Sequence, residues 1–282
     1  MGRGSCHHRR RWAVWVRSPT GEPMTIQVDP DWWKSIFDEV YLLTDARSVC
    51  NSDVTGREVD LVCQLLPIRP EHRILDLCGG HGRHSIEFSR RGHRCTLLDY
   101  SPHLLGRAQT ESTRCALPLQ CVRADARKTG LGSCRFDHVL ILGNSLGYAA
   151  ESDADREILM EAHRVLCPGG YLLVDVADGE AIFAAFNANA WHEADAQLVV
   201  CRQREIHGNT IRAREVVLSK DRGLIRESYY AIRVYDADSL SRLLEEAGFQ
   251  AIRVLREFSP HPAKGDYGFM NRRMVVLGRK PS

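Results

Sequence analysis

The sequence has 282 residues, of which 44% are hydrophobic and 26% are charged, a composition typical of a soluble globular protein with one large domain or two small ones. No apolar run approaches the roughly 20 residues that span a bilayer, so we expect no membrane-spanning segment. The first 23 residues carry five arginines against one acid, whereas the whole chain has a net charge of only +2. The remaining body is therefore close to neutral, which argues against a nucleic-acid partner.

Ten cysteines are scattered along the chain, and no two of them form a C-x-x-C pair. Several fall in apolar stretches that we expect to be buried strands, where free cysteine is a common small core residue. Reduced thiols are typical of a cytoplasmic protein, which is the location we expect. A site where two or three cysteines meet around a thiophilic metal is the alternative.

The N-terminal residues 1–23 show no sustained periodicity, and their short apolar run is followed by Arg17. That run is too short for the core of a signal peptide. We expect a disordered extension, with Met24 as the working start of the protein. An arm that binds nucleic acid or directs targeting is the alternative.

Residues 24–70 are predicted to form an N-terminal helical cap. The run DPDWWKSIFDEVY at 29–41 predicts an amphipathic helix, with Asp29 as the N-cap and Pro30 at the first helical position. A second helix is predicted over 55–66, where apolar side chains recur at helical spacing and two prolines follow.

A nucleotide-binding βαβ unit is indicated by the run RILDLCGGHGRHSIEFSRRGHRCTLLDYS at 73–101. An apolar strand leads into a glycine cluster, a helix over 83–91, a second apolar strand and then Asp99. The glycines allow the backbone to approach a ligand closely. Asp99 is placed to accept hydrogen bonds from the two hydroxyls of a ribose.

The pattern of strand and helix continues to about residue 177. Ser101 and Pro102 begin another helix, as N-cap and first residue. Further elements are predicted as strands at 119–122, 136–142 and 171–176, a helix at 153–166 and a tight turn at 167–170. Such alternation predicts a doubly wound, mostly parallel sheet with helices on both faces, which binds ligands at the carboxyl ends of its strands.

Beyond Asp178 the pattern changes. A short helix at 180–186 precedes β-like sequence at 197–235, which predicts a three-stranded antiparallel meander. If Gly208 and Asn209 form a two-residue turn, Arg202 faces Glu215 and Glu205 faces Arg212, and opposite charges in those positions stabilise a sheet. Most of the arginines of this segment are therefore expected on a solvated face, with an anion-binding patch as the alternative. A helix at 238–247 and strands at 249–256 and 273–279 complete the chain.

The residues around the glycines favour one nucleotide over another. Ser85 occupies the position of the third glycine of a dinucleotide fingerprint, which disfavours NAD. Asp76 lies four residues before Gly80 and would repel a pyrophosphate. A carboxylate there suits the cationic amino-acid end of S-adenosylmethionine (SAM), directly or through water.

At this point the sequence resembles the class I SAM-dependent methyltransferases. The resemblance covers roughly residues 30–282 and rests on LDLCGGHGRHS at 75–85, LLDYS at 97–101, Ala124-Asp125-Ala126, FDHVLILGNSLGY at 136–148, RVLCPGGYLLVDV at 164–176 and LLEEAGF at 243–249. It implies a Rossmann-like sheet of seven strands whose last strand is antiparallel. The SAM-binding domain would comprise 71–177 and 236–282, and 178–235 would be an insertion forming an acceptor-site lid or a dimer contact.

The resemblance also implies which residues contact the cofactor. The methionine part would meet the glycine loop, the ribose the acid after the second strand, and the adenine the acid after the third. The N-terminal helix would close over the cofactor, and the residues after the fourth strand would line the transferring centre. The implied cofactor-binding residues are Trp33, Tyr41, Asp76, Cys78, Gly79, Gly80, Asp99, Tyr100, Asp125, Ala126, Gly143 and Asn144.

The implied activity is methyl transfer from SAM to an O, N or S atom of a small molecule by in-line displacement, in a monomer or a homodimer. In this family an N-P-P-Y motif after the fourth strand is typical of enzymes that methylate planar amino groups. Residues 144–147 lack it, which argues against methylation of a nucleic-acid base or a glutamine amide. His192 is the first candidate for a general base and Tyr148 the second. His81 and His84 flank the cofactor loop, so we expect no metal there. The alternatives are a protein or RNA methyltransferase, a non-catalytic SAM-binding partner protein and an NAD-dependent oxidoreductase.

Overall fold

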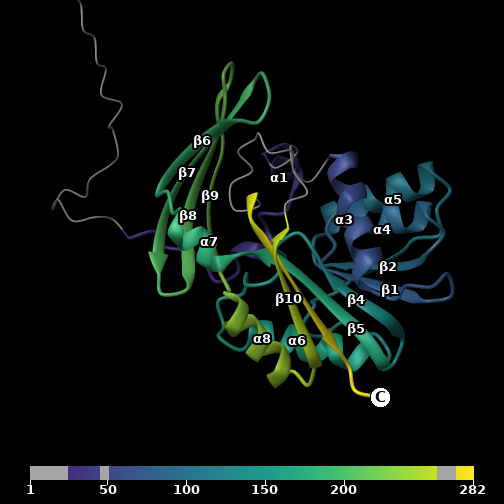
Figure 1. The fold of residues 1–282 in the computed structure, drawn as a ribbon. Helices are drawn as coiled ribbons and strands as arrows, with labels where there is room; N and C mark the ends of the chain where they lie inside the picture. The colour runs from purple at the N-terminus through teal and green to yellow at the C-terminus, as the bar shows by residue number, and fades with distance from the viewer. Residues whose placement is uncertain (1–24, 45–50, 259–270) are drawn as a thin grey trace, which may run out of the picture.

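A computed structural model describes residues 25–44, 51–258 and 271–282 of the chain. The expectations for residues 1–23 and for Met24 lie outside that range. Two sheets organise the described residues, a seven-stranded sheet and a separate four-stranded one (Figure 1). Among the described residues no helix combines the length and the apolar character that crossing a membrane requires.

The large sheet has the strand order β10-β11-β5-β4-β1-β2-β3. Its strands are β1 (Arg73–Leu77), β2 (Arg94–Asp99), β3 (Gln120–Arg123), β4 (Phe136–Ile141), β5 (Leu166–Ala177), β10 (Gln250–Phe258) and β11 (Arg273–Arg279). The five strands from β5 to β3 are parallel, and β11 runs antiparallel to both of its neighbours. The predicted Rossmann-like sheet of seven strands with an antiparallel last strand is confirmed.

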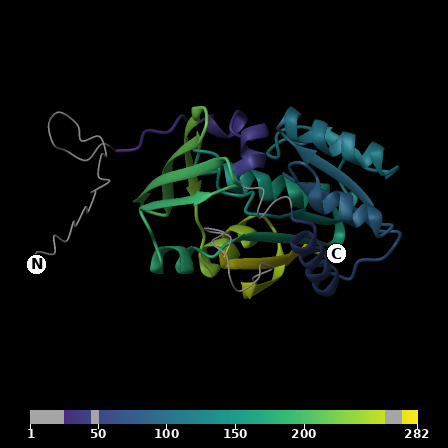
Figure 2. The same cartoon turned by 90° about the horizontal axis from the view of Figure 1, so that it is seen from above.

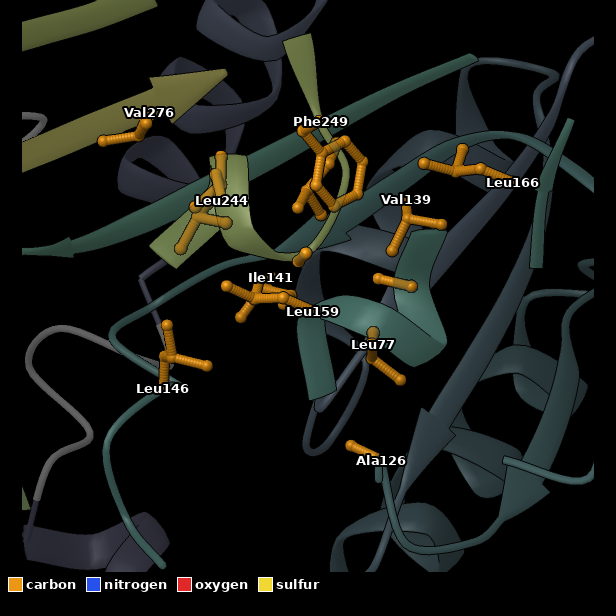
Figure 3. Close-up of a cluster of buried hydrophobic side chains, with 14 of the residues drawn as sticks. Leu77, Ala126, Val139, Ile141, Leu146, Leu159, Leu166, Leu244, Phe249 and Val276 are labelled. Carbon is orange, nitrogen blue, oxygen red and sulfur yellow. The ribbon is translucent and has the colours of Figure 1, made fainter. Parts of the chain in front are cut away.

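Helices cover both faces of this sheet. They are α3 (Ser52–Leu65), α4 (Arg83–Arg90) and α5 (Pro102–Arg114) on one face, and α6 (Ala154–Val165) and α8 (Ala237–Glu246) on the other. Figure 3 shows the apolar cluster of the second face, where Leu159 and Leu244 pack on strand residues such as Val139 and Ile141. Burying each such side chain contributes about 1.5–3 kcal/mol to folding, which fixes the strand ends that carry the site.

The strand β5 begins earlier than the sequence predicts. Residues 167–170, expected as a tight turn, belong to the strand, and its register with β4 shifts between the pairs Phe136↔Leu166 and His138↔Tyr171. The extra residues form a bulge in which Gly169 has φ +78°. A glycine adopts that left-handed conformation at little cost, so the strand continues through it.

The four-stranded sheet corrects the prediction of a three-stranded meander. It follows α7 (Gly179–Ala184) and consists of β6 (Asn189–Glu193), β7 (Leu198–His207), β8 (Thr210–Ser219) and β9 (Gly223–Arg233). The predicted register of β7 and β8 is confirmed, because Arg202 faces Glu215 and Glu205 faces Arg212. The strand β6 was missed because only five residues form it, at the edge of the sheet.

The arginines of this insertion divide between its two faces, so the expectation of a solvated face is wrong for some of them. Arg202 and Arg226 both donate to Glu215, a buried residue on the covered face. Arg204 lies on the same face and is 8% exposed. Arg214, on the opposite face, pairs with Glu227 near solvent. Arg202 and Arg226 satisfy a buried carboxylate, which the alternating sequence pattern alone could not reveal.

The predicted helix over 29–41 is also wrong. The segment forms a 3₁₀ turn, η1 (Trp32–Lys34), and a separate helix, α1 (Glu39–Thr44). Arg226 takes the carbonyl of Ile36, and the hydroxyl of Ser101 donates to the carbonyl of Phe37 at 2.7 Å. A continuous helix would need both carbonyl oxygens as acceptors for its own backbone amides, so these two contacts compete with it. Figure 2 shows this segment lying between the insertion sheet and the helices of the large sheet.

Candidate active site

A cavity of about 1090 Å³, counting the part that opens to solvent, lies at the carboxyl ends of the parallel strands. The loops after β1, β2, β3 and β4 form its base, and the N-terminal segment forms its opposite wall. Eleven of the residues predicted from the sequence line it: Trp33, Tyr41, Cys78, Gly79, Gly80, Asp99, Tyr100, Asp125, Ala126, Gly143 and Tyr148. Asp76, Asn144 and His192 do not.

The glycine loop is shaped for close approach. A Cβ atom at Gly79 would lie 2.4 Å from Leu97 and 2.5 Å from the carboxyl carbon of Asp76, so no larger residue fits there. Gly80 has φ +59°, and its amide donates to Asp99 at 2.8 Å. Cys78 has φ +61°, a left-handed conformation that costs a non-glycine residue free energy.

Asp99 is held by two backbone amides. One carboxylate oxygen accepts from Gly80 and the other from Ser101, each at 2.8 Å. Burial raises the pKa of Asp99, while these amide hydrogen bonds oppose that rise. Each carboxylate oxygen keeps further acceptor capacity, so the geometry fits the two hydroxyls of a ribose.

One end of the cavity holds a carboxylate that is already paired with a cation. Arg127 binds Asp125 through Nε and Nη2, with a distance of 2.7 Å from Nη2. Burial would raise the pKa of Asp125, but the hydrogen bonds from Arg127 lower it overall. The guanidinium of Arg127 lies 5.5 Å from the ring centre of Trp33, which meets Tyr100 edge-on at 4.9 Å. Flat rings beside a hydrogen-bonding edge suit a purine.

Two residues predicted to touch the cofactor lie behind the cavity surface. Asp76 is fully buried beneath Gly79 and accepts from the hydroxyl of Ser85 at 2.6 Å, and its other oxygen has no hydrogen-bond partner among the described residues. Burial raises the pKa of Asp76 to about 6. The side chain of Asn144 accepts from the amide of Ala177 at 2.9 Å and so fixes the end of β5.

A buried ionic network backs the cavity, and the sequence analysis missed it. Arg273 on β11 is 1% exposed and contacts Asp175 on β5 and Glu58 on α3. The second oxygen of Asp175 accepts from the amide of Gly143 at 3.0 Å, which connects the network to the cavity wall. Glu58 lies 215 residues from Arg273, so no local sequence signal could reveal the pairing.

The other end of this network reaches the glycine loop. Glu58 also binds Arg83 and, at 2.8 Å, Nε2 of His84. Burial and the nearby Arg83 lower the pKa of His84 to about 4, so this histidine is neutral near pH 7. Its ring is committed to a structural contact. No group of three or more His, Cys, Asp or Glu side chains in the described ranges is placed to hold a metal ion.

Aromatic side chains line the remaining end of the cavity. Phe37 stacks on Tyr148 with ring centres 5.5 Å apart, and Tyr41 meets Phe37 edge-on at 5.1 Å. Trp32 joins Tyr148 to Tyr230 of β9, at 5.3 and 5.7 Å. This aromatic cluster joins the N-terminal segment, the loop after β4 and the insertion sheet.

The loop that carries Tyr148 is fixed from below. The amide of Gly147 donates to Asp155 at 3.0 Å, and Asp155 also accepts from the hydroxyl of Tyr235. A Cβ atom at Gly147 would lie 2.2 Å from the carbonyl oxygen of Arg233, so only glycine allows this approach. Tyr148 is therefore held in a defined position at the cavity wall.

His192 lies apart from the cavity. It belongs to β6 and shares the covered face of the insertion sheet with Val200, its cross-strand partner. Its Nε2 lies 3.4 Å from the carbonyl oxygen of Thr44, at the end of α1. Because His192 does not line the cavity, the geometry gives its predicted role as a base no support.

Three comparisons with known proteins agree with this geometry. A family model described as a methyltransferase domain matches residues 74–170. The chain is 26% identical over 196 residues to the putative methyltransferase YqeM of Bacillus subtilis, covering 66% of this chain and 77% of that protein. It is 29% identical over 196 residues to a glycine/sarcosine N-methyltransferase of Aphanothece halophytica, covering 66% and 69%. A SAM-dependent methyltransferase structure from Clostridium acetobutylicum aligns with a TM-score of 0.67 and 13% identity, over 86% of this chain and 97% of that one.

The doubly wound sheet with an antiparallel last strand, the cavity at its strand ends and the matched domain together identify a SAM-dependent methyltransferase. The chain carries a methyltransferase domain and has the fold of the class I SAM-dependent methyltransferases, and its cofactor is S-adenosylmethionine. The cradle at Gly79 and the two-amide support of Asp99 fit that group. The alternative of an NAD-dependent oxidoreductase is thereby set aside.

Proposed function

We propose that this enzyme methylates a small molecule held between the glycine loop and the aromatic cluster of Phe37, Tyr41 and Tyr148. The observation that carries the proposal is the wall opposite the cofactor loop. The N-terminal segment and the loop after β4 meet there through stacked rings, which leaves a bounded cavity rather than an open groove. The relative from Aphanothece halophytica, named for glycine and sarcosine, supports an acceptor of this size.

Within this proposal the cavity residues divide the cofactor between them. Asp99 takes the ribose hydroxyls, and Asp125 and the amide of Ala126 take the adenine edge beside Tyr100. The loop at 78–80 takes the methionine part, and Gly143 lies at the transferring centre. Asp76 and Asn144 act from behind the surface, by shaping the loop and the end of β5.

The insertion is proposed to act as the outer support of the acceptor site. Tyr230 on β9 packs on Trp32, and Arg226 holds both the carbonyl of Ile36 and the carboxylate of Asp38. These contacts fix the segment that presents Phe37 to the cavity. The insertion therefore sets the shape of the wall without lining it.

When bound, SAM supplies a methyl group on an already activated sulfonium centre. The chain supplies position and the exclusion of water, and holding two reactants in line can contribute effective molarities of about 10⁵ M or more. An oxygen acceptor also requires a base. Tyr148 replaces His192 as the first candidate, because its side chain lies at the cavity wall.

The test is an acceptor screen with the full-length chain. Methyl-labelled SAM is incubated with panels of small amines, amino acids, thiols and phenols, and in parallel with protein and RNA pools. We expect label in a small-molecule fraction together with release of S-adenosylhomocysteine. Label confined to protein or RNA would overturn the proposal. Once an acceptor is known, Tyr148→Phe should lower kcat for an oxygen acceptor, whereas His192→Ala should leave it unchanged.

A further inference from the structure

Arg83 is a cavity residue to which neither the sequence motifs nor the roles above give a function. It is the first residue of α4, directly after the glycine loop, and its side chain is 12% exposed. Its Nη2 lies 3.7 Å from the position that a Cβ atom would take at Gly143, across the cavity floor. The guanidinium therefore spans the gap between the glycine loop and the end of β4.

Only part of this guanidinium is used by the protein. Nη1 donates to the hydroxyl of Thr55 at 3.1 Å and to Glu58. Glu58 is held in turn by Arg273 and His84, so the plane of the Arg83 guanidinium is fixed from behind. In the described part of the chain, Nε and Nη2 have no hydrogen-bond partner. The edge formed by these two nitrogens is the geometry that binds a carboxylate through two parallel hydrogen bonds.

The charges around the cavity indicate which anion fits this edge. Among the described residues that line it, Arg83 and Arg127 are the two guanidiniums, and Arg127 already binds Asp125 at the adenine end. Asp76 lies beneath the loop beside Arg83: burial raises the pKa of Asp76, and the Arg83 guanidinium opposes that rise. The open edge of Arg83 matches the carboxylate of an α-amino acid, and the buried Asp76 can act on the ammonium only from beneath the loop.

We propose that the Nε–Nη2 edge of Arg83 binds the α-carboxylate of the methionine half of SAM, while Asp76 lies on the side of the ammonium. The inference rests on the cofactor assignment and does not depend on which acceptor is methylated. A carboxylate could also come from an amino-acid acceptor. Binding measurements made without any acceptor separate these two sources.

The test compares SAM with decarboxylated SAM by isothermal titration calorimetry on the full-length chain. We expect the unaltered protein to bind SAM at least about 10-fold more tightly, because a charge-assisted pair contributes on the order of 10- to 100-fold in affinity. Arg83→Gln should weaken SAM by that factor and leave decarboxylated SAM unchanged, so the preference disappears. Arg83→Lys keeps the charge without the fork and should keep part of the preference.

Arg91→Gln is the matched control, because Arg91 follows the same helix and pairs with Glu87 and Asp60 outside the cavity. It should leave both affinities unchanged. Equal weakening of both ligands by Arg83→Gln would overturn the inference, as would a wild-type protein that does not distinguish them. Thermal unfolding checks the fold of each variant, and if the Gln variant does not fold, the comparison between the wild type and Arg83→Lys decides.

Discussion

The two ends of the cavity are built in different ways. At the cofactor end, Asp99 binds the amide of Gly80, only 19 residues earlier, and the amide of Ser101, two residues later. At the aromatic end, Arg226 binds the carbonyl of Ile36 across 190 residues. The cofactor end is thus specified by a local motif and the aromatic end by long-range contacts, so changes elsewhere in the chain can alter the aromatic end without altering the cofactor end.

The ionic networks behind the two ends of the cavity also differ, in how far their charged side chains are exposed to solvent. Arg273, behind the cofactor end, is 1% exposed, whereas the Asp38 side chain that Arg226 holds is 43% exposed. A charge that loses its partner in a dry interior costs far more than one near water. We therefore expect the first network to control global stability and the second to control local opening of the N-terminal segment.

The largest effect is expected from Arg273→Met. The change leaves Asp175 without its cation and removes one partner of Glu58, and breaking a buried ion pair from one side costs about 3–5 kcal/mol. Urea unfolding followed by circular dichroism measures the loss. Arg256→Gln is the control, because its pair with Glu180 is exposed and should contribute at most about 1 kcal/mol. Equal losses in the two variants would contradict the contrast between the networks.

Asp76 gives the cofactor end a pH dependence of known sign. Burial raises its pKa to about 6 from an ordinary value of 3.8, so its contribution favours the folded state below about pH 4 and is lost as the pH rises to about 6. The loss is on the order of 3 kcal/mol. Asp76→Asn cannot ionise, so the difference in unfolding free energy between variant and wild type should shift in the variant's favour across that window. A difference that does not change with pH would rule this out.

Arg226→Gln should cost less stability than Arg273→Met, because the buried Glu215 keeps Arg202 as a partner, and its clearest effect should be local. Losing hydrogen bonds to Asp38 and to the carbonyl of Ile36 should free α1 while leaving β1 and β2 unchanged. We expect amide hydrogen exchange in the N-terminal segment to accelerate by on the order of 10-fold. Arg214→Gln breaks the exposed pair with Glu227 on the other face of the same sheet and should not change that exchange. If both variants behave alike, Arg226 does not fix the segment.

The same contrast decides how much the sequence could predict. The glycine loop, Asp99, the N-cap Ser101 and the parallel strands followed from local pattern and capping chemistry, and the structure has them. The broken N-terminal helix did not, because its geometry depends on Arg226 and Ser101, which capture carbonyls that a helix would use. The burial of the covered arginines was not predicted, because the alternation of residues along a strand does not say which face of the sheet is covered. Arg83 was named only as part of a motif, because the sequence does not show that Glu58 occupies Nη1 and that Nε and Nη2 have no hydrogen-bond partner among the described residues.

The insertion also has a consequence for how such a protein can be modified. Its two ends meet where Asp178 pairs with Tyr235 and the amide of Gly179 donates to the carbonyl of Tyr235 at 2.9 Å. The chain therefore leaves the large sheet and returns to it at the same place. We expect that the strands of the insertion can be lengthened, shortened or exchanged without moving β5 or α8. The insertion can therefore change in length or sequence while the sheet that carries the cavity keeps its geometry.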